Sequence, residues 1–598
     1  MSSKPKPIIF IFERITNGQL CRGIILVLMM TVILIFLLLP PVSLADRLLN
    51  IGYHRVGPGN GVISDSNGEQ IIVLLTGLKR SLWVKLEVVS GAMLTADDTL
   101  FTAGKNIPPD LKISGPVYHI QHRGDSPAAA KLIISIPAGV GPLHTLDLYT
   151  WNGEIWAWLP NRKISAGNVI EAELDFLPET VAIVQSGNVG EFGQRQPATF
   201  LPGLFTEMGL ELNPQEFLLN NNGSLIATPV KIPPEIKESA VTIIPTIRNW
   251  NDPQPILSNS VNNLLRNPEA QQRHIKAIVE IVQRNTYQGI NLDYRGIDPG
   301  LRQEYTGFLT QLRRALPDNT YLSVQVDMPR PLSAGEDISS PYDWQAIGQT
   351  VDFVKVPTSP DPSAFAPGGE METMLDWAVG QVNRSKLQLL FRVHSVEQIN
   401  GITYDLNYQR AWAQAGEVKL VNDSDTFNPD QKIEFTLSAP STSTGVQIDD
   451  ATGTYWYAYV DEKNRHHTVY LENAAGITDA SRLVAKYNLH GLVFQNLPDS
   501  TNGDRPWEVI QRLLTSNDPL LESQYTLVWL VQRQDGRVMA EKALDLTNPN
   551  FVWIAPETGG VYDVAASIFS NQKAGMAIPR GSVRVLVTTP TPGPASTP

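Results

Sequence analysis

Residues 46–190 consist of short segments in which apolar and polar positions alternate, separated by Gly, Pro and Asn turns. Examples are "GEQIIVLLTGL", "SLWVKLEVV", "AKLIISIP" and "VIEAELDFLPETVAIV". Alternation with a period of two and regularly spaced turns is typical of strands in an antiparallel sandwich. The pattern therefore predicts an N-terminal β-sandwich over residues 46–190.

One segment of this region, "DLYTWNGEIWAWLP", carries Trp151, Trp156 and Trp158 around an Asn-Gly turn. Exposed rings in a row would suit stacking on sugar faces. A hairpin with aromatic cross-strand pairs gives the same letters. We favour packing within the hairpin or the core.

From about residue 197 to residue 514, strands alternate with helical segments. The segment "QQRHIKAIVEIVQRN" places Ile275, Ile278 and Val282 on one helical face, and the strand "GINLDY" follows it. Further strands are "TYLSVQVDMPRP", "VDFVKVPTSPD", "LQLLFRVHSV" and "HGLVFQNLP". Repeated units of this length predict a (β/α)8 TIM-type barrel over 197–514, with its chemistry at the carboxyl ends of the strands.

Two further regions have a different pattern. Residues 401–467 are polar and contain the strand-like runs "VKLVN", "KIEFTLSA" and "YWYAYV", which predict a small α+β insertion on the barrel rim. Residues 522–587 return to alternation in "YTLVWLVQRQDGRVMAEKALDL" and "SVRVLVTT". They predict a C-terminal immunoglobulin-like β-sandwich.

The two ends of the chain cannot bury a core. The run "GIILVLMMTVILIFLLLPP" follows a basic stretch and precedes Ser43-Leu44-Ala45, as in a secretory signal. Residues 1–45 are therefore a cleaved signal peptide or an uncleaved N-terminal membrane anchor. The tail at residues 588–598, "TTPTPGPASTP", predicts an extended, disordered spacer. We expect an exported protein, extracellular or in the cell envelope.

Composition excludes several partners. A net charge of -13 argues against nucleic acid, which requires a basic face. Cys21 is the only cysteine, so an intramolecular disulfide and a Cys-based metal site are both excluded. His466 and His467 are adjacent on a predicted strand and point to opposite faces, so we assign them a surface or strand-edge role. No metal and no cofactor is expected.

The stretch "YQGINLDYRGID" has an unusual end for a barrel strand. Alternate residues face inward, so Asn291, Asp293 and Arg295 share the interior face at its carboxyl end. Ile290 and Tyr294 belong to the opposite face, toward the helices. A strand that places an acid in the barrel therefore ends on a base.

These elements resemble glycoside hydrolase family 18, in particular the bacterial branch of spore-cortex and other peptidoglycan-lytic enzymes. The family's strand Asp-Gly-x-Asp/Asn-x-Asp-x-Glu falls on Gln288, Gly289, Asn291, Asp293 and Arg295. Further matches are "VTIIPTIRNW" and "HTVYLENAAGITDASRLVAKYNLHGLVF". The resemblance covers about half the chain and implies a glycan that contains N-acetylglucosamine, either peptidoglycan or a chitin-like polymer.

The departures from the family fall on chemical positions. Arg295 stands where the resemblance places the catalytic glutamate. Pro357, Ser359 and Pro360 stand where a Met-x-Tyr-Asp sequence is usual, and Gln495 stands where the last strand usually has tryptophan. The resemblance therefore implies the family's fold without its usual catalytic groups.

In the family, the glutamate protonates the glycosidic oxygen while the sugar's own N-acetyl carbonyl attacks, an exception to the two-carboxylate scheme. A guanidinium keeps its proton at any physiological pH, so Arg295 cannot serve as the acid. Loss of a general acid alone forfeits about a hundred- to ten-thousandfold in rate. Arg295 is expected either to form a charge-assisted bridge with Asp293 or to turn outward to solvent.

Two aspartates could supply a relocated acid: Asp298 just past the strand, and Asp327 at the end of the next strand. Both also suit turn capping or surface solvation, which we favour. Tyr294 is expected in the core. The candidate glycan-binding residues are Trp250, Asp293, Arg295, Trp344 and Trp456.

The interpretation drawn from the sequence is an exported, multidomain cell-envelope protein whose barrel has lost catalysis. It would bind an N-acetylated glycan or a cell-wall polymer, or act as a scaffold. A glycosidase with a relocated acid and a purely structural surface protein are the alternatives. The N-terminal segment, if uncleaved, makes the membrane a further partner.

Overall fold

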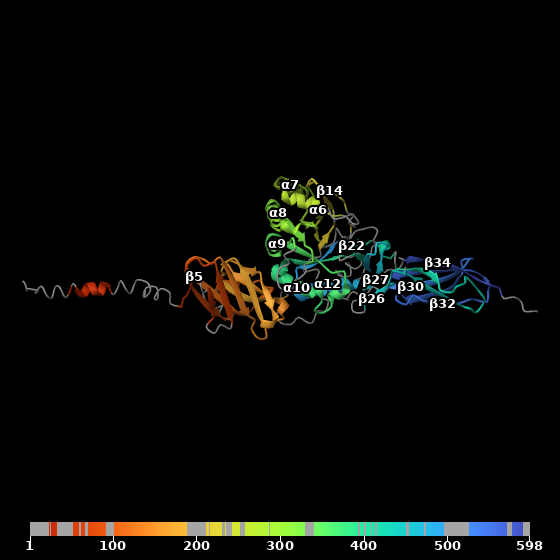
Figure 1. Ribbon diagram of the computed structural model, residues 1–598, viewed down its shortest axis with the longest axis horizontal. Coiled ribbons are helices and arrows are strands. Elements are labelled where there is room, and N and C mark those ends of the chain that lie inside the picture. Colours follow the sequence, from red (N-terminus) through yellow and green to blue (C-terminus); the bar gives the residue numbers. More distant parts are fainter. Residues whose placement is uncertain are drawn as a thin grey trace, which may run out of the picture.

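The molecule is elongated in the computed structural model, with the N-terminal sheets at one end, the barrel in the middle and the C-terminal sheets at the other end (Figure 1). The structure describes the following residues: 23, 25–32, 52–58, 61–65, 70–90, 101–187, 211–214, 216–229, 234, 242–250, 258–285, 287–328, 340–392, 395–399, 402–406, 408–412, 415–439, 441–449, 454–471, 474–495, 525–570 and 577–589.

Residues 23 and 25–32 are helical, and their apolar side chains are exposed. None of the helices in the described ranges is both long and apolar enough to cross a bilayer. The rest of the predicted signal or anchor, the cleavage site after Ala45 and residues 590–598 of the predicted tail lie outside the described residues.

Two antiparallel sheets form the N-terminal module, which we define as residues 54–186. Their inward side chains, such as Val84, Ile120 and Leu132, make up one hydrophobic core. The six-stranded sheet has the order β1-β4-β5-β11-β7-β8: β1 His54–Val56, β4 Leu82–Val89, β5 Leu111–Arg123, β11 Thr180–Ser186, β7 Leu146–Trp151 and β8 Trp156–Leu159. The five-stranded sheet has the order β2-β3-β6-β10-β9: β2 Val62–Ser64, β3 Ile71–Thr76, β6 Ala129–Ser135, β10 Val169–Leu174 and β9 Arg162–Ile164.

The tryptophan-rich hairpin lies on the outer face of the six-stranded sheet, under the short helix α3 Phe101–Lys105. Trp151 and Trp156 are directly paired across β7 and β8, with ring centroids 5.8 Å apart. The Trp156 indole nitrogen donates to the carbonyl of Ala103 at 2.9 Å. The prediction that these rings pack within the protein is confirmed for this pair.

The central sheet is a parallel, TIM-type barrel. β12 pairs in parallel with the last strand, β29, and also with β15, and β15 continues after two residues into β16. The neighbouring pairs then return the sheet to β29, which closes the ring. The strands are β12 Glu211–Asn213, β13 Phe217–Leu219, β15 Thr242–Ile243, β16 Thr246–Arg248, β17 Gly289–Asp293, β18 Tyr321–Gln325, β19 Phe353–Pro357, β20 Leu387–Arg392 and β29 Gly491–Gln495.

Eight parallel strands were expected. The described residues give seven, counting β15 with β16 as one strand and β12 with β13 as another. The reason is that β12 and β13 form a single path along one neighbour, because β12 pairs with β15 and β13 pairs with β16. The short strand β14 Leu225–Ala227 then turns back antiparallel to β13.

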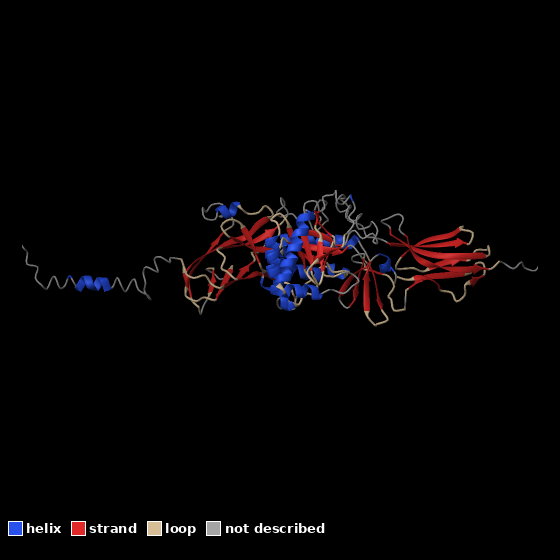
Figure 2. Ribbon diagram, turned by 90° about the horizontal axis from the view of Figure 1, so that it is seen from above, coloured by secondary structure: helices blue, strands red, loops and turns tan. Residues whose placement is uncertain are grey.

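Helices cover the outside of the barrel (Figure 2). Their apolar faces share one core with the outward side chains of the strands, among them Ile290, Leu292 and Tyr294. The face predicted for Ile275, Ile278 and Val282 is buried in this core. The helices are α6 Ser258–Arg266, α7 Pro268–Asn285, α8 Arg302–Ala315, α9 Trp344–Thr350, α10 Glu370–Gln381 and α12 Ala474–Tyr487.

The inserted segment follows β20 and divides between two structures. Its outer parts form a five-stranded sheet, the insertion sheet, in the order β22-β21-β28-β27-β26. Its strands are β21 Ser395–Ile399, β22 Ile402–Leu406, β26 Gln447–Ile448, β27 Tyr455–Val460 and β28 His466–Tyr470. The short helix α11 Tyr408–Trp412 packs its Trp412 into a hydrophobic core that also contains Tyr455 and Val469 of this sheet.

The middle of the segment joins the C-terminal strands. β25 pairs antiparallel with β32, and β24 pairs in parallel with β34, because the apolar faces of both regions are buried in one core. The sequence places a self-contained α+β insertion beside a separate domain, whereas the structure builds the C-terminal module from both. Its strands are β23 Glu417–Leu420, β24 Thr426–Phe427, β25 Lys432–Ser438, β30 Tyr525–Arg533, β31 Val538–Asp545, β32 Phe551–Ile554, β33 Gly560–Ser570 and β34 Ala577–Val587.

The N-terminal module docks on the barrel through buried charges. Arg384 lies directly before β20, at the amino end of the barrel, and donates from Nε to the Asp147 carboxylate at 2.6 Å. The same guanidinium donates to the carbonyls of His144 and Tyr487. Lys163 lies 3.3 Å from the other Asp147 oxygen. The two modules are therefore joined at the end of the barrel opposite the predicted site.

Candidate functional site

The carboxyl end of β17 places its polar side chains inside the barrel, as its alternation predicts. Asn291 is buried, donates to the Thr246 hydroxyl at 3.0 Å and accepts from the Ser323 hydroxyl at 3.1 Å. These bonds cross to the strands on both sides of β17. Asp293 lies one pleat nearer the mouth and is also buried.

Arg295 turns toward Asp293 and not outward to solvent. Its Nε donates to Asp293 Oδ1 at 3.1 Å, and its Nη2 donates to Oδ2 at 3.0 Å. The side chains of Arg295 and Asp293 are 14% and 2% exposed. The predicted charge-assisted bridge is present, and its paired hydrogen bonds fix the guanidinium plane.

The same guanidinium covers Trp250. Arg295 Cζ lies 3.7 Å from the Trp250 ring centroid, and Arg248 Cζ lies 5.5 Å from the same ring system. Trp250 is 3% exposed. A cation at this distance is attracted by the ring quadrupole. Trp250, proposed from the sequence as a sugar-stacking ring, instead stacks on Arg295.

The backbone of Arg295 is held by Asn249, which is fully buried at the end of β16. The Asn249 side chain accepts from the Arg295 amide at 2.8 Å and donates to the Arg295 carbonyl at 2.8 Å. Gly296 follows with φ of 67°, a left-handed conformation that glycine adopts without strain. Two neighbouring strands therefore fix the direction in which the arginine leaves the barrel.

Tyrosines surround the bridge on its outer side. Tyr342 donates from its hydroxyl to the Tyr294 carbonyl at 2.9 Å, and both rings are buried. Burial raises the pKa of Tyr342 well above its usual value, and the charges of Asp327 and Asp293 act in the same direction while Arg295 acts against them. The Tyr342 hydroxyl therefore lies within electrostatic range of both Asp327 and the bridge between Arg295 and Asp293.

Tyr294 faces the helices, as predicted. His274 of α7 lies 2.6 Å from the Tyr294 hydroxyl through Nε2 and 2.8 Å from the Gly223 carbonyl through Nδ1. Nδ1 must carry the proton to donate to a carbonyl, so Nε2 accepts from the tyrosine. Burial lowers the pKa of His274 to about 4.

The carboxyl end of β19 offers no acid or phenol at the positions where the resemblance expects them. Pro357 ends the strand, and Ser359 is buried with its amide directed at the Met371 sulfur, 3.3 Å away. Of Gln495, only its place at the end of β29 is described.

Deeper in the barrel lies an ion pair that sequence reasoning missed. Lys355 of β19 is fully buried and pairs with Glu211 of β12. Asn213 accepts from the lysine at 2.8 Å, and Gln388 donates to Glu211 at 3.0 Å. Burial lowers the pKa of Lys355. At Glu211 burial is the largest single influence, but the lysine charge and the hydrogen bonds from Lys355, Asn213 and Gln388 together outweigh it and lower the pKa of that carboxyl. Both are inward positions of strands, so strand parity was an available signal.

The first relocated-acid candidate, Asp298, has a structural role. Its carboxylate forms an ion pair with Arg266 at 2.8 Å and accepts from the Gly300 amide at 3.0 Å. It caps the short 3-10 helix Pro299–Leu301. The second candidate, Asp327, is exposed beyond the end of β18.

The two remaining tryptophan candidates, Trp344 and Trp456, lie in different environments. Trp344 is 3% exposed and begins α9, where it packs edge-on against Trp377 of α10 at 5.0 Å. It is a core residue in this structure and is not placed to contact a glycan.

Trp456 of β27 is half-buried and directly opposite Tyr470 of β28. Burial and the charge of Asp361, in the loop after β19, raise the pKa of Tyr470 to about 12. This face of the insertion sheet therefore lies near the carboxyl end of the barrel, with Trp456 on it.

His467 is better connected than the sequence indicates. Its Nδ1 lies 2.8 Å from Glu397 and its Nε2 lies 3.2 Å from Asp461, while the Tyr459 ring stacks on it at 4.4 Å. The side chain is 5% exposed, because β28 is a central strand of the insertion sheet. No cluster of three or more potential metal ligands occurs in the described ranges.

Comparison with known proteins gives the following matches. The model of glycosyl hydrolases family 18 matches residues 220–498. A Bacillus subtilis protein named "Uncharacterized glycosylase YvbX" is 23% identical over 304 residues, which are 50% of this chain and 82% of that protein. A Bacillus subtilis "Cortical fragment-lytic enzyme" is 25% identical over 291 residues, 47% of this chain and 63% of that protein.

Among solved structures, a Bacillus cereus spore cortex-lytic enzyme, SleL, is similar with a TM-score of 0.34 and 17% identity, covering 51% of this chain and 68% of that chain. A chitinase from Chromobacterium violaceum is similar with a TM-score of 0.38 and 18% identity, covering 52% and 94%. Residues 220–498 therefore form a glycosyl hydrolases family 18-like domain, and this part of the chain is similar to cortical fragment-lytic enzymes.

Proposed function

We propose that this protein is an exported cell-envelope protein whose family 18-like barrel binds an N-acetylglucosamine-containing glycan without cleaving it. One observation carries the proposal. At the position where the resemblance places the catalytic glutamate, Arg295 is locked to Asp293 by two hydrogen bonds and stacked on Trp250.

The chemistry of this position opposes hydrolysis. Protonation of a glycosidic oxygen needs an acid whose pKa lies near the working pH, and a guanidinium does not release its proton. Asp293 is engaged by Arg295, and therefore cannot orient an N-acetyl group as the family's aspartate does. Ser359 and Pro360 supply neither the phenol nor the carboxylate that would replace it.

Glycan binding requires polar groups and an aromatic face, and the rim of the barrel offers both. Trp456 and Tyr470 lie together on one face of the insertion sheet, half-buried, near the loop after β19. Arg295 keeps part of its side chain exposed at the mouth. A glycan lying across the mouth would contact the Trp456 face on one side and the guanidinium on the other.

Asp327 supports the second candidate, an active glycosidase with a relocated acid. It is exposed, and it acts on the hydroxyl of Tyr342 together with Asp293 and Arg295. Asp327 follows β18, the strand next to β17, so its carboxyl lies in the same part of the barrel as Asp293. Asp298 is the other candidate; it forms an ion pair with Arg266 and accepts from the Gly300 amide.

The experiment uses the full chain with N-acetylglucosamine oligomers and with peptidoglycan, measuring binding by calorimetry and cleavage by release of reducing ends. We expect binding without cleavage. Trp456→Ala should weaken binding about five- to thirtyfold, since stacking of a sugar face on an aromatic ring contributes on the order of 1–2 kcal/mol. Trp344→Phe, a core substitution outside the mouth, is the control and should leave binding unchanged.

Cleavage by the unaltered chain would contradict the proposal, and Asp327→Asn and Asp298→Asn, made separately, would then show which carboxylate supplies the acid. Arg295→Glu restores a carboxyl but not the missing tyrosine, so we expect no measurable turnover from it. Absence of both binding and cleavage would leave only a structural role for the barrel.

A further inference from the structure

The outer face of the N-terminal module has two different ends. At one end α3 covers the six-stranded sheet, over side chains that include Val89 and Val117. At the other end, the register aligns Arg55, Trp83 and Arg123 on β1, β4 and β5 as direct cross-strand neighbours. Paired residues point to the same face of a sheet, so these side chains form one row on the outside.

A second row continues the pattern. Lys85 is paired with Gln121, and the Tyr53 hydroxyl donates to the Gln121 side chain at 3.1 Å. The Arg123 guanidinium lies over the Tyr53 ring at 4.3 Å, which joins the two rows. Cations and aromatic rings therefore alternate across this end of the sheet.

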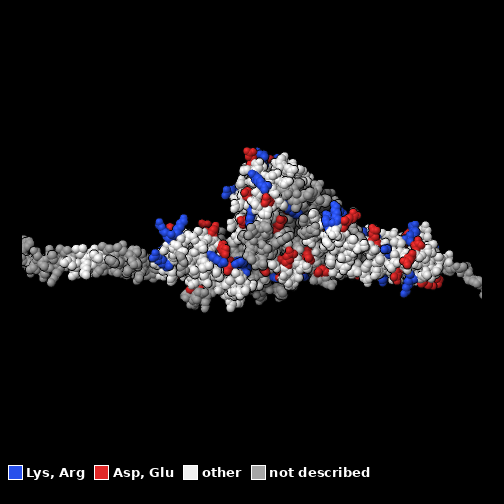
Figure 3. Space-filling model, in the orientation of Figure 1, with Lys and Arg blue, Asp and Glu red and all other residues white. Residues whose placement is uncertain are grey.

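The turn between β3 and β4 adds two more cations to the same end. Lys79 and Arg80 are exposed, and the adjacent Ser81 accepts a hydrogen bond from Arg55 at 3.3 Å. We call the set the basic-aromatic patch; its residues are Tyr53, Arg55, Lys79, Arg80, Trp83, Lys85 and Arg123. Figure 3 shows Lys and Arg side chains gathered at this outer end of the module.

The charge of the patch is opposite to that of the whole chain, which carries -13. Two acids of the described residues flank it: Glu87, which forms an ion pair with Lys85 at 2.5 Å, and Asp125, which is exposed in the turn after β5. The five cations of the patch outnumber these two carboxylates. Arg55, Lys79, Arg80 and Arg123 are all exposed.

The patch lies next in the chain to an apolar helix. The side chains of residues 25–30 are exposed by 59% to 66%, and none is charged. Tyr53 and Arg55 follow Val32 by about twenty residues, a length of chain that cannot exceed about 70–80 Å when fully extended. Any surface that buries the apolar helix is therefore held at high effective concentration near the patch.

We propose that the basic-aromatic patch docks the N-terminal module on an anionic lipid bilayer. Arginine and lysine are attracted by anionic headgroups, and Tyr and Trp rings favour the interface between headgroups and acyl chains. The apolar helix supplies attachment, and the patch fixes which face of the module meets the membrane. The barrel mouth and the patch are then on separate modules, so glycan binding and membrane docking are independent.

The test is the rate at which Lys79 reacts with an amine-directed reagent, followed by peptide mass spectrometry on the full chain in proteoliposomes. In vesicles containing phosphatidylglycerol, Lys79 should react at least about fivefold more slowly than in phosphatidylcholine alone. Each cation near an anionic surface strengthens binding about fivefold, and the reagent reaches Lys79 only while the patch is undocked. Lys276, which is 80% exposed on the barrel, is the internal reference. High salt should abolish the difference.

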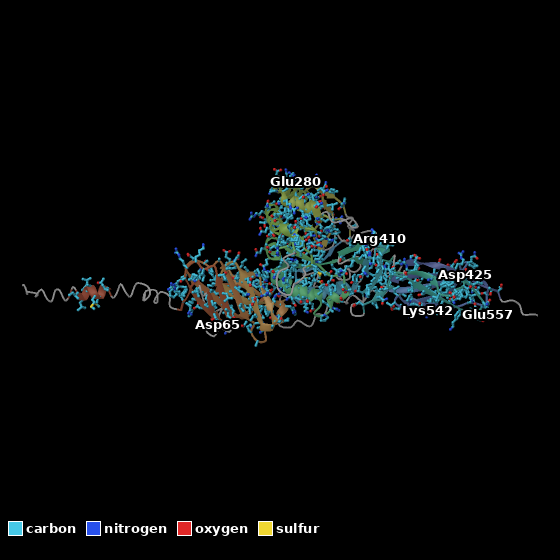
Figure 4. All side chains as sticks on the ribbon, in the orientation of Figure 1. Asp65, Glu280, Arg410, Asp425, Lys542 and Glu557 are labelled. Carbon is cyan, nitrogen blue, oxygen red and sulfur yellow. The ribbon has the colours of Figure 1, made fainter. Side chains whose placement is uncertain are left out.

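Arg55→Glu/Arg123→Glu should remove the protection of Lys79. The matched control, Lys432→Glu/Lys542→Glu, makes the same change of charge on the C-terminal module, in which Figure 4 labels Lys542, and should retain the protection. Equal rates in both kinds of vesicle would overturn the proposal. Protection by a soluble polyanion but not by phosphatidylglycerol would also overturn it, in favour of an anionic polymer.

Discussion

Two arginine–aspartate pairs lie at opposite ends of the barrel. Arg295 and Asp293 meet at the mouth, two residues apart at the end of β17, with the arginine 14% exposed. Arg384 and Asp147 meet at the closed end, 237 residues apart, with side chains 3% and 1% exposed. The first pair occupies a position where the family places a catalytic acid, and the second joins two modules.

The difference is one of environment and not of residue type. At the mouth, the Arg295 guanidinium also contacts Trp250 and is partly exposed to solvent. Loss of this pair therefore leaves the contact between the modules intact. At the amino end of the barrel, Arg384 also donates to three backbone carbonyls. Its removal leaves the buried Asp147 carboxylate with Lys163 but without the guanidinium, and leaves several buried acceptors. The mouth pair concerns function, whereas the junction pair concerns the arrangement of the molecule.

Arg384→Ala should have the largest effect. Removal of one partner from a buried ion pair typically costs about 3–5 kcal/mol. We expect this loss in the free energy of the unfolding transition that includes the junction, measured by urea denaturation with hydrogen exchange at β7. Arg482→Ala, which breaks the pair between an exposed arginine and the half-buried Asp479, should cost at most about 1 kcal/mol. Similar costs for the two variants would show that Arg384 does not hold the junction.

Lowering the pH from 7 to 5 should destabilise both ends of the barrel. Burial lowers the pKa of His274 to about 4, and burial together with the charges of Lys486 and Arg384 lowers that of His144 to about 4. The unfolded chain takes up a proton near pH 6.5 while the folded chain does not, so stability falls between pH 6.5 and 4.

The expected loss at pH 5 is on the order of 2 kcal/mol for His274 and about half of that for the more exposed His144. The measurement is urea unfolding at both pH values for the unaltered chain, His274→Asn and His144→Asn. Each variant should lose its share of the pH dependence. An unchanged dependence in His274→Asn would mean that other groups carry it.

Arg295→Ala should cost less than Arg384→Ala, about 1–2 kcal/mol, because the mouth admits water to the uncovered Asp293. The Trp250 ring loses the nearer of the two guanidinium groups that lie over it and becomes more exposed, which tryptophan fluorescence should report. Arg266→Ala, which breaks the exposed pair with Asp298, is the matched control and should cost no more than about 1 kcal/mol. A cost for Arg295→Ala as large as for Arg384→Ala would remove the contrast between the two ends.

Strand parity made much of the mouth predictable. The alternation in "GINLDY" placed Asn291 and Asp293 inside the barrel and Tyr294 outside, and the structure has them there. The bridge from Arg295 to Asp293 follows from the same parity, because Asp293 ends β17 and Arg295 follows it by two residues. The fate of Trp250 did not follow, because it depends on which neighbour crosses its face.

The divided insertion was not predictable in the same way. β25 has the alternation of a half-buried strand, but nothing in that alternation says that its partner is β32, more than a hundred residues later. Likewise, Trp344 follows a polar stretch in the sequence, as a surface aromatic residue would. Its packing against Trp377 shows that it belongs to the core.

The sequence by itself determined the order of the structural elements, the face on which each side chain lies and the chemistry missing at Arg295, because these depend on local periodicity and residue type. The tertiary structure decided which charges meet, namely Arg384 with Asp147 and Lys355 with Glu211, and which strands share a sheet. Those outcomes depend on burial, since a charge in an apolar interior needs a partner wherever in the chain that partner lies.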